Sequence, residues 1–369
     1  MDRRTFLKST VALVTAGFAP APKTKPLLIV YLDGGASQWD TVDFKPDWGE
    51  NMRGPFGPLQ TATQGVVFSD QLQTLAGEID KALLLRGVVG ESHDHYGAAQ
   101  KSLWNEHRKT LARRTGHKTV GLPYAVVTAP PKGGGYENPA HQVYEALEFK
   151  WHEEYERYEA SLPGNLDRPI GLIGLLEQLD SGSVQQSRWD SLRRLGLDLL
   201  TGGETLSQAA DLPAGERERF GSTPFGDALL LARRLIDSGS AAVTVRYLDA
   251  LAYDWHYNLD KQAVPILGAL DRGLAALIAD RPDFVTLVAT EFGRTPGLET
   301  GSGRNHWAKS MSWLLFGPGI RTGVYGSTDR RGVAVADGQL THEQVQNTVL
   351  LACGAEIPPG SPREEALLH

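Results

Sequence analysis

The sequence predicts an α/β protein built around a doubly wound, mostly parallel β-sheet. Residues 26–32 and 284–289 are continuous apolar runs, which is the pattern of strands buried on both faces, and residues 83–89 predict a third strand. In the last third of the chain, such runs alternate with segments of helical periodicity. Alternating helices and strands are typical of a sheet with helices packed on both faces.

The remaining elements are expected in order along the chain. Short apolar runs predict further strands at residues 65–68, 124–128, 241–248 and 311–316. Apolar spacing of three and four predicts helices at residues 98–104, 225–238, 264–279 and 343–353. Residues from about 140 to 215 are charged and rich in helix-forming residues, and we expect a helical insertion there that covers or flanks the site.

Length and composition restrict the class of protein. The 369 residues suffice for one large α/β domain or two modest ones. The formal net charge is -7 and the sequence contains no basic stripe, which argues against a nucleic-acid partner. The single cysteine, Cys353, excludes an internal disulfide and lies in an apolar helical run, as expected for a buried structural thiol.

The N-terminus has the pattern of an export signal. Arg3 and Arg4 precede a mildly apolar segment, residues 11–19, which is too short to span a bilayer. We therefore expect residues 1–25 to be a twin-arginine (Tat) signal and the protein to be periplasmic or extracellular. An uncleaved signal would be its contact with the membrane.

The strand at 284–289 ends in a group of polar residues. Glu291 follows the strand, where a buried carboxylate is costly unless it is paired, and a glycine-rich loop then leads to His306. A carboxylate and an imidazole suit a metal, and Arg294 and Arg304 suit an oxyanion. A strand cap held by a Glu–Arg pair is the alternative.

Two other strands end in similar residues. Asp33 follows the strand at 26–32, and Asp254 and His256 follow the strand at 241–248. Because the carboxyl ends of parallel strands meet at one edge of a sheet, we expect these side chains and Glu291 to gather there. A mixed set of Asp, Glu and His without thiolates suits Zn²⁺, Mn²⁺, Mg²⁺ or Ca²⁺.

A further candidate lies at the turn after the strand at 83–89. Ser92, His93 and His95 stand between this strand and the helix at 98–104. Polar groups at a strand-to-helix turn are a candidate catalytic site, although a solvated turn is the alternative.

Several of these motifs carry a resemblance to a known family. Together they resemble DUF1501, a family of Tat-exported bacterial proteins placed in the alkaline phosphatase and sulfatase superfamily. The matching segments are Arg-Arg-x-Phe-Leu at 3–7, Leu-Asp-Gly-Gly-x-Ser-Gln-x-Asp-Thr at 32–41, Leu-Ala-Arg-Arg-Leu-Ile at 231–236, Asp-Trp-His-x-Asn at 254–258, Glu-Phe-Gly-Arg-Thr-Pro at 291–296 and Gly-Arg-Asn-His-Trp at 303–307. The resemblance implies one alkaline-phosphatase-like domain over residues 26–369, a three-layer sandwich around a mostly parallel sheet. It implies no particular substrate.

The superfamily plan can be placed on this sequence residue by residue. Its first metal-binding Asp falls on Asp33 and its last metal-binding His on His306. One Asp–His pair falls on Asp254 with either Asn258 or His256. A second pair falls on residues 291–292, where Phe292 replaces the imidazole, so a single metal or a remodelled site is expected.

The resemblance implies a metal-dependent hydrolase acting on a phosphate or sulfate ester. The metal would polarise the ester, and Arg294 and Arg304 would hold the remaining anionic oxygens. Ser92 or Ser37 would be the nucleophile, and His93 or His95 the acid or base. The expected partner is a small anionic ester or a sulfated or phosphorylated glycan. The alternative is a catalytically degenerate member that binds a ligand or partner in the cell envelope.

Overall fold

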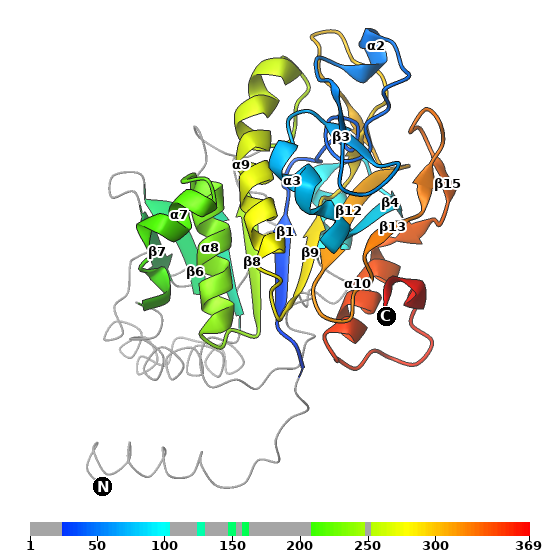
Figure 1. Ribbon diagram of the computed structural model, residues 1–369. Helices are drawn as coiled ribbons and strands as arrows, with labels where there is room; N and C mark the ends of the chain where they lie inside the picture. Colours follow the sequence, from blue (N-terminus) through cyan, green and yellow to red (C-terminus); the bar gives the residue numbers. More distant parts are fainter. Residues whose placement is uncertain (1–23, 104–123, 130–146, 153–156, 162–207, 248–251) are drawn as a thin grey trace, which may run out of the picture.

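A computed structural model of the chain describes residues 24–103, 124–129, 147–152, 157–161, 208–247 and 252–369 (Figure 1). Its centre is a ten-stranded sheet with the order β13-β4-β12-β9-β1-β8-β5-β6-β7, in which β16 also pairs with β4. The strands of this sheet are β1 (Leu27–Tyr31), β4 (Leu83–Val89), β5 (Tyr124–Ala129), β6 (Leu147–His152), β7 (Arg157–Ser161), β8 (Ala242–Tyr247), β9 (Val285–Ala289), β12 (Met311–Phe316), β13 (Gly323–Tyr325) and β16 (Leu340–Thr341).

Most strands of this sheet run in the same direction. The central strand β1 is parallel to both β8 and β9, and β5 continues the parallel arrangement beyond β8. Strand β12 is antiparallel to both of its neighbours, and β7 is antiparallel to β6. The sheet is therefore mixed but mostly parallel.

Helices cover both faces of the sheet (Figure 1). One face of β1, with Leu28 and Val30, belongs to an apolar cluster shared with α3 (Gln73–Glu78), α8 (Pro224–Asp237) and α9 (Leu259–Ala279). The other face, with Leu27 and Ile29, packs in a second cluster with α4 (His95–Leu103) and α10 (His342–Ala352). The alternation of side chains along β1 therefore supplies both cores, as expected for a three-layer α/β arrangement.

Short elements complete the part of the chain that the structure describes. The helical pieces are α2 (Glu50–Arg53), α7 (Ala214–Arg219) and the 3₁₀ turns η1 (Ile79–Lys81) and η5 (Glu365–Leu367). The two-stranded ribbons are formed by β2 (Pro58–Gln60) with β3 (Val67–Ser69), β10 (Gly293–Arg294) with β11 (His306–Trp307), and β14 (Ser327–Thr328) with β15 (Val335–Asp337).

Local sequence signals explain where the longer helices begin. Thr223 accepts a hydrogen bond from the Gly226 N–H and precedes Pro224, a favourable first residue of a helix. Thr341 and Gln344 form a reciprocal capping box at the start of α10. Helix α9 is the one helix in the described residues long and apolar enough to cross a membrane, but 61% of its apolar window is buried in the core. Packing against α3 and α8 accounts for that composition.

Most predicted elements are present, with one correction. The predicted mostly parallel sheet is confirmed, and β12 is an antiparallel strand within it, because no helical crossover separates β9 from β12 and a reversed strand needs none. The predicted helical insertion contains strands β6 and β7, where helices were expected. In β6, apolar and polar residues alternate as in a half-buried strand, and this period outweighs the helix propensity of its Glu and Lys. Residues 162–207 lie outside the described part, so the rest of the insertion stays a prediction.

A buried histidine makes the fold sensitive to acid. His342, the first residue of α10, is 6% exposed and stacks on Trp313 with ring centroids 5.0 Å apart. Burial lowers the pKa of His342 from 6.5 to about 4. The unfolded chain therefore binds a proton at His342 more readily than the folded chain does. The stability that the neutral, buried His342 allows is complete above pH 6.5 and is lost as the pH falls through 4.

We predict that, between pH 7 and pH 4, the wild type loses about 3 kcal/mol more unfolding free energy than His342→Phe does. The phenyl ring keeps the stacking on Trp313 and cannot be protonated. Urea denaturation at both pH values measures the difference, with His369→Phe, at the exposed C-terminus, as the control. Equal acid sensitivity in the wild type and His342→Phe would contradict the assignment.

Candidate metal centre

The carboxyl ends of β8, β1 and β9 bring three carboxylates to one edge of the sheet. Asp33 follows β1, Glu291 follows β9, and Asp254 lies in the segment after β8. The backbone links these segments directly, because the Tyr253 N–H donates to the Asp33 carbonyl at 3.2 Å. The predicted gathering of polar residues at this edge is therefore present.

Three ligand-type atoms converge above this edge. The Nε2 atoms of His256 and His306 lie 2.9 and 3.2 Å from Oδ1 of Asp254, and 3.1 Å from each other. In a tetrahedral zinc site with bonds of about 2.0–2.1 Å, neighbouring ligand atoms are about 3.3 Å apart. The triangle formed by these atoms therefore has nearly the size that such a metal requires.

His95 extends the group to four residues, which we call the His–Asp cluster: His95, Asp254, His256 and His306. Its Nε2 lies 3.7 Å from Oδ2 of Asp254. His95, Asp254 and His306 each offer one ligand atom within 4.8 Å of the others. Three imidazoles and one carboxylate favour a zinc-like metal over Mg²⁺ or Ca²⁺, which prefer oxygen ligands.

Hydrogen bonds orient two of these imidazoles toward the cluster. Nδ1 of His306 lies 2.6 Å from the His93 carbonyl oxygen, which can only accept, so Nδ1 carries a proton and Nε2 is the nitrogen directed at the cluster. Nδ1 of His95 lies 2.9 Å from Oε1 of Glu291, which fixes its tautomer in the same way. A histidine held by a carboxylate or carbonyl on its far nitrogen is the usual arrangement around bound metals.

A close backbone approach places His306 beside His256. Strand β11 pairs with β10 so that His306 lies opposite Arg294. A Cβ at Gly303 would lie 2.1 Å from the carbonyl carbon of His256, so only glycine fits there. The Arg304 N–H then donates to the Trp255 carbonyl at 2.8 Å, which fixes the two segments together.

An apolar ring forms one side of the cluster. Phe292 is fully buried and stacks on His306 with ring centroids 4.3 Å apart, and its centroid is 4.9 Å from that of His95. Gly35 accommodates it, since a Cβ there would lie 2.3 Å from the phenyl ring. His95, from α4, therefore packs against the same ring as His306.

Both predicted anion-binding arginines are committed to the protein itself. Arg294 is 1% exposed and donates from its three guanidinium nitrogens to the carbonyls of Gly34, Gly35 and Arg304 and to Asp254. Arg304, also 1% exposed, holds Asp40 in a two-point ion pair at 2.7 and 3.0 Å and donates to four backbone carbonyls. Their geometry in this structure is that of loop-holding residues.

Asp33 is engaged by a residue outside the sequence-based prediction. The Arg246 guanidinium, from β8, contacts its two carboxylate oxygens at 2.5 and 3.3 Å. Burial nevertheless raises the pKa of Asp33 to about 6, against the lowering effect of Arg246. Arg246 was missed because it looks like a single charged residue in an apolar strand. Arg246 reaches Asp33 because the register of the parallel strands β1 and β8 places Arg246 beside Tyr31.

The electrostatics of the cluster favour an ionised carboxylate. Burial would raise the pKa of Asp254, but hydrogen bonds from His306 and His95 and the charge of Arg294 hold it well below its usual range. Burial would lower the pKa of His95, but Asp254 and Glu291 raise it to about 9. Burial lowers the pKa of His256. Without a metal the cluster holds a proton on His95, which a metal would have to displace.

The hydroxyl and imidazole candidates around the cluster serve local structure. Ser92 donates to Asp94, which also accepts from the Gly97 N–H at 2.8 Å at the start of α4. Ser37 is 1% exposed and donates to Asp40 at 2.5 Å. His93 accepts from the Ala308 N–H at 3.2 Å through Nδ1.

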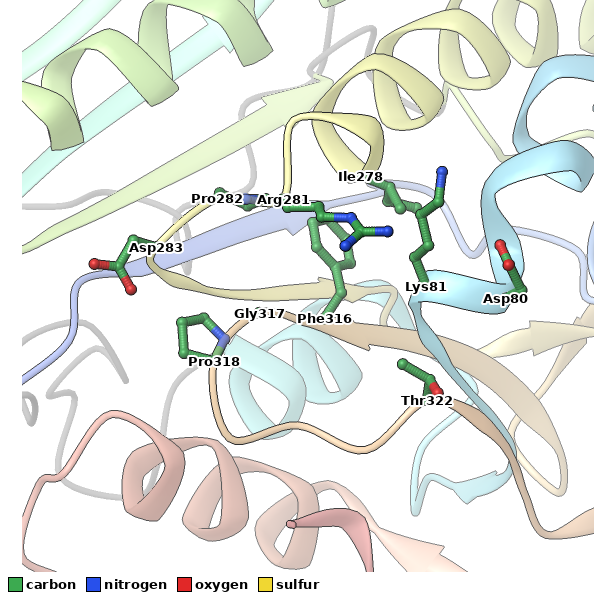
Figure 2. Close-up of a pocket in the computed structure, with 10 residues that line it drawn as sticks. All are labelled: Asp80, Lys81, Ile278, Arg281, Pro282, Asp283, Phe316, Gly317, Pro318 and Thr322. Atoms are coloured by element: carbon green, nitrogen blue, oxygen red, sulfur yellow. The ribbon is translucent and has the colours of Figure 1, made fainter.

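A cavity of about 520 Å³ lies at the opposite end of the sheet (Figure 2). It is lined at the start of β9 by residues 281–283, at the end of β12 by residues 316–318, and by Lys81. Positive and negative side chains both line it, and Lys81 pairs with Glu78. Because strand direction separates this cavity from the His–Asp cluster, it is not part of the site.

Comparison with known proteins identifies the family. Residues 194–357 match the sequence model of DUF1501, described as a protein of unknown function. Over this stretch, the chain belongs to the DUF1501 family. The match includes Asp254, His256, Glu291 and His306, and it confirms the family predicted from the motifs. No curated protein matches the sequence.

Among solved structures, this DUF1501 chain is similar to three hydrolases at low identity. A sulfatase from Pseudoalteromonas sp. is 10% identical, with 100% of this chain and 77% of that chain covered and a TM-score of 0.41. A phosphonate monoester hydrolase from Silicibacter pomeroyi is 10% identical, with 93% of this chain and 76% of that chain covered and a TM-score of 0.40. An alkaline phosphatase from the Antarctic bacterium TAB5 is 13% identical, with 85% of this chain and 96% of that chain covered and a TM-score of 0.34. Similarity of this size decides neither the substrate nor the chemistry of the DUF1501 chain.

The buried Arg304–Asp40 pair holds the loops beside the cluster, so breaking it is expected to destabilise the fold. We predict that Asp40→Asn lowers the unfolding free energy by about 3 kcal/mol, because Arg304 is left as an uncompensated buried charge. Chemical denaturation measures this loss. Glu91→Gln, in the exposed Lys101–Glu91 pair, is the control and is expected to cost less than about 1 kcal/mol. Equal losses in the two variants would contradict the structural role of the pair.

Proposed function

We propose that this DUF1501 chain is a metal-dependent hydrolase of a phosphate or sulfate ester, with an alkaline-phosphatase-like α/β fold. The observation that carries the proposal is the convergence of Asp254, His256 and His306 on one point, with atoms 2.9–3.2 Å apart. Tertiary structure brings these residues together from the segment after β8 and from β11, and each is oriented as a ligand.

Asp254, His256 and His306 would hold the metal, and His95 would lie beside it. A divalent metal bound there would polarise the ester and lower the pKa of an attacking water. Three protein ligands leave a fourth position open, as in catalytic zinc sites. The donor set favours zinc among the metals considered.

The Arg246 guanidinium supports a single metal. Arg246 neutralises Asp33, so the carboxylate that a second metal would need already faces a fixed positive charge. Glu291 accepts from the Gly34 N–H at 2.8 Å as well as contacting His95. We therefore assign Glu291 to positioning His95, and Asp33 to the ion pair with Arg246.

The described hydroxyls favour water as the nucleophile. Ser37 and Ser92 both donate to neighbouring aspartates, away from the cluster. His95 keeps a nitrogen directed at Asp254 and is, among the residues that the structure describes, the group best placed to move a proton at the site. Its contact with Glu291 fixes the position of that nitrogen.

A second candidate follows from the same cluster. If His95 becomes a fourth ligand, the site is closed like a structural zinc site and has no open position. The chain would then be a degenerate member that binds a ligand or partner in the cell envelope. The commitment of Arg294 and Arg304 to backbone carbonyls favours this alternative, because neither guanidinium is left to hold an anion.

The location and substrate are also proposals. We propose export by the Tat pathway to the periplasm or beyond, on the basis of Arg3 and Arg4; residues 1–23 lie outside the described part. The substrate class is a small anionic ester, of which a sulfated or phosphorylated glycan is one form.

We predict one bound metal per chain, together with turnover of phosphate or sulfate esters. Asp254→Ala is expected to abolish both, because Asp254 contacts every other member of the cluster. Elemental analysis and an ester panel measure the two properties. Asp283→Ala, an exposed carboxylate at the opposite end of the sheet, is the control. Undiminished turnover after removal of the metal would refute the proposal of a metal-dependent hydrolase. Bound metal without turnover would favour the envelope-binding alternative.

We predict that Glu291→Gln weakens metal binding by about 10–100-fold without abolishing it. The amide keeps the shape of Glu291 but removes a negative charge from beside the metal. Competition with a chelator of known affinity measures the change, and Glu356→Gln, at an exposed position, is the control. Complete loss of metal would instead make Glu291 a direct ligand.

A further inference from the structure

The three histidines of the cluster share a sequence feature that the proposed chemistry does not use. Each is followed directly by an aromatic residue, in the pairs His95-Tyr96, His256-Tyr257 and His306-Trp307. We call Tyr96, Tyr257 and Trp307 the aromatic rim.

Two residues of the aromatic rim are unusually exposed. Tyr257 is 62% exposed and Tyr96 is 47% exposed. In the part of the chain that the structure describes, only four large apolar side chains are exposed, and these are two of them. Single exposed apolar residues are ordinary on protein surfaces, but two of four beside one polar cluster point to a binding surface.

The backbone holds Tyr257 in place although its ring is exposed. Tyr257 forms an antiparallel bridge with Ser302, and the next residue, Asn258, donates to the Gly301 carbonyl at 2.9 Å. A Cβ at Gly301 would lie 2.8 Å from the Tyr257 ring, so glycine makes room for it. Asn258 and Ser302 have φ values of 48° and 62°, a left-handed conformation that costs energy for residues other than glycine. The ring is therefore positioned by backbone pairing.

Tyr257 lies against a side of the cluster that solvent reaches. The ring centroid of Tyr257 is 6.3 Å from that of His256, whose side chain is 31% exposed. The side chain of His95, which Tyr96 follows in the sequence, is 28% exposed. Trp307 is half-buried, and its indole N–H donates to the Val333 carbonyl at 2.7 Å. An anion bound at the cluster would thus have the Tyr257 ring beside it.

We propose that Tyr257, in the aromatic rim, binds the organic part of the ester, and that the substrate carries a ring with a flat apolar face. This inference rests on the proposed function, because it assumes that the anionic group is held at the His–Asp cluster. A compact ester would leave the rim in water, whereas a ring could stack on Tyr257 and gain contact area at little entropic cost. An aromatic ring and the apolar face of a sugar ring share this chemistry.

The test compares three phosphonates that carry the same anionic group on the zinc-loaded protein. Methylphosphonate is compact, phenylphosphonate carries an aromatic ring, and a pyranosylmethyl phosphonate carries a sugar ring. Titration calorimetry gives each dissociation constant for the wild type, Tyr257→Ala and Tyr257→Phe. Val324→Ala, at another exposed apolar side chain on the edge strand β13, is the control.

We predict that at least one ring phosphonate binds about tenfold more tightly than methylphosphonate. Tyr257→Ala is expected to abolish this preference, while Tyr257→Phe and Val324→Ala retain it. A preference confined to the phenyl or the pyranosyl compound assigns the ring as aromatic or sugar, respectively.

Equal affinity for all three phosphonates, or a ring preference that survives Tyr257→Ala, would overturn the inference and leave the anion site intact. Binding of none of them would contradict the anion site itself, and the inference with it.

Discussion

The guanidinium of Arg294 is the interaction on which the architecture of the site depends. It is almost completely buried and donates to the carbonyls of Gly34 and Gly35, to the carbonyl of Arg304, and to the carboxylate of Asp254. These acceptors belong to the segment after β1, the loop before β11 and the segment after β8. A single planar side chain with five donors thus sets the spacing of three loops. Burial lowers its pKa, and the charge of Asp254 compensates for the desolvation.

The site brings a carboxylate and an imidazole together from distant parts of the chain. Phe292 follows Glu291 and forms an apolar wall against His306. His95 reaches the same place from the start of α4 and contacts Glu291 at 2.9 Å. The carboxylate and the imidazole are therefore adjacent in space although they are 196 positions apart in sequence.

Charge balance explains why Asp33, Asp40 and Asp254 are tolerated below or beside the cluster. Each faces one buried guanidinium, from Arg246, Arg304 and Arg294 respectively. A buried carboxylate without a partner would either destabilise the fold or take up a proton. The two interpretations considered for Glu291 and Arg294, a metal site and a structural ion pair, thus describe neighbouring parts of one network.

Local sequence patterns determined much of the fold. The apolar runs that became β1, β4, β9 and β12 were recognisable because strands buried on both faces need apolar residues at every position. The direction of β12 was not recognisable, because the same apolar composition fits either orientation. The region of β6 and β7 was predicted to be helical, because short segments with many charged residues are compatible with either a helix or a strand.

The sequence by itself determined which residue types gather at the sheet edge, because the carboxyl ends of parallel strands are adjacent whatever the details of the loops. Only the tertiary structure decided their partners: Arg246 for Asp33, Asp40 for Arg304, and Glu291 for His95. These pairings join residues between 196 and 264 positions apart. They depend on strand register and on close backbone approaches at Gly35 and Gly303, which no periodicity in the sequence reports. The chemistry of each side chain is local, but its role is set by the one neighbour that the fold places within hydrogen-bonding distance.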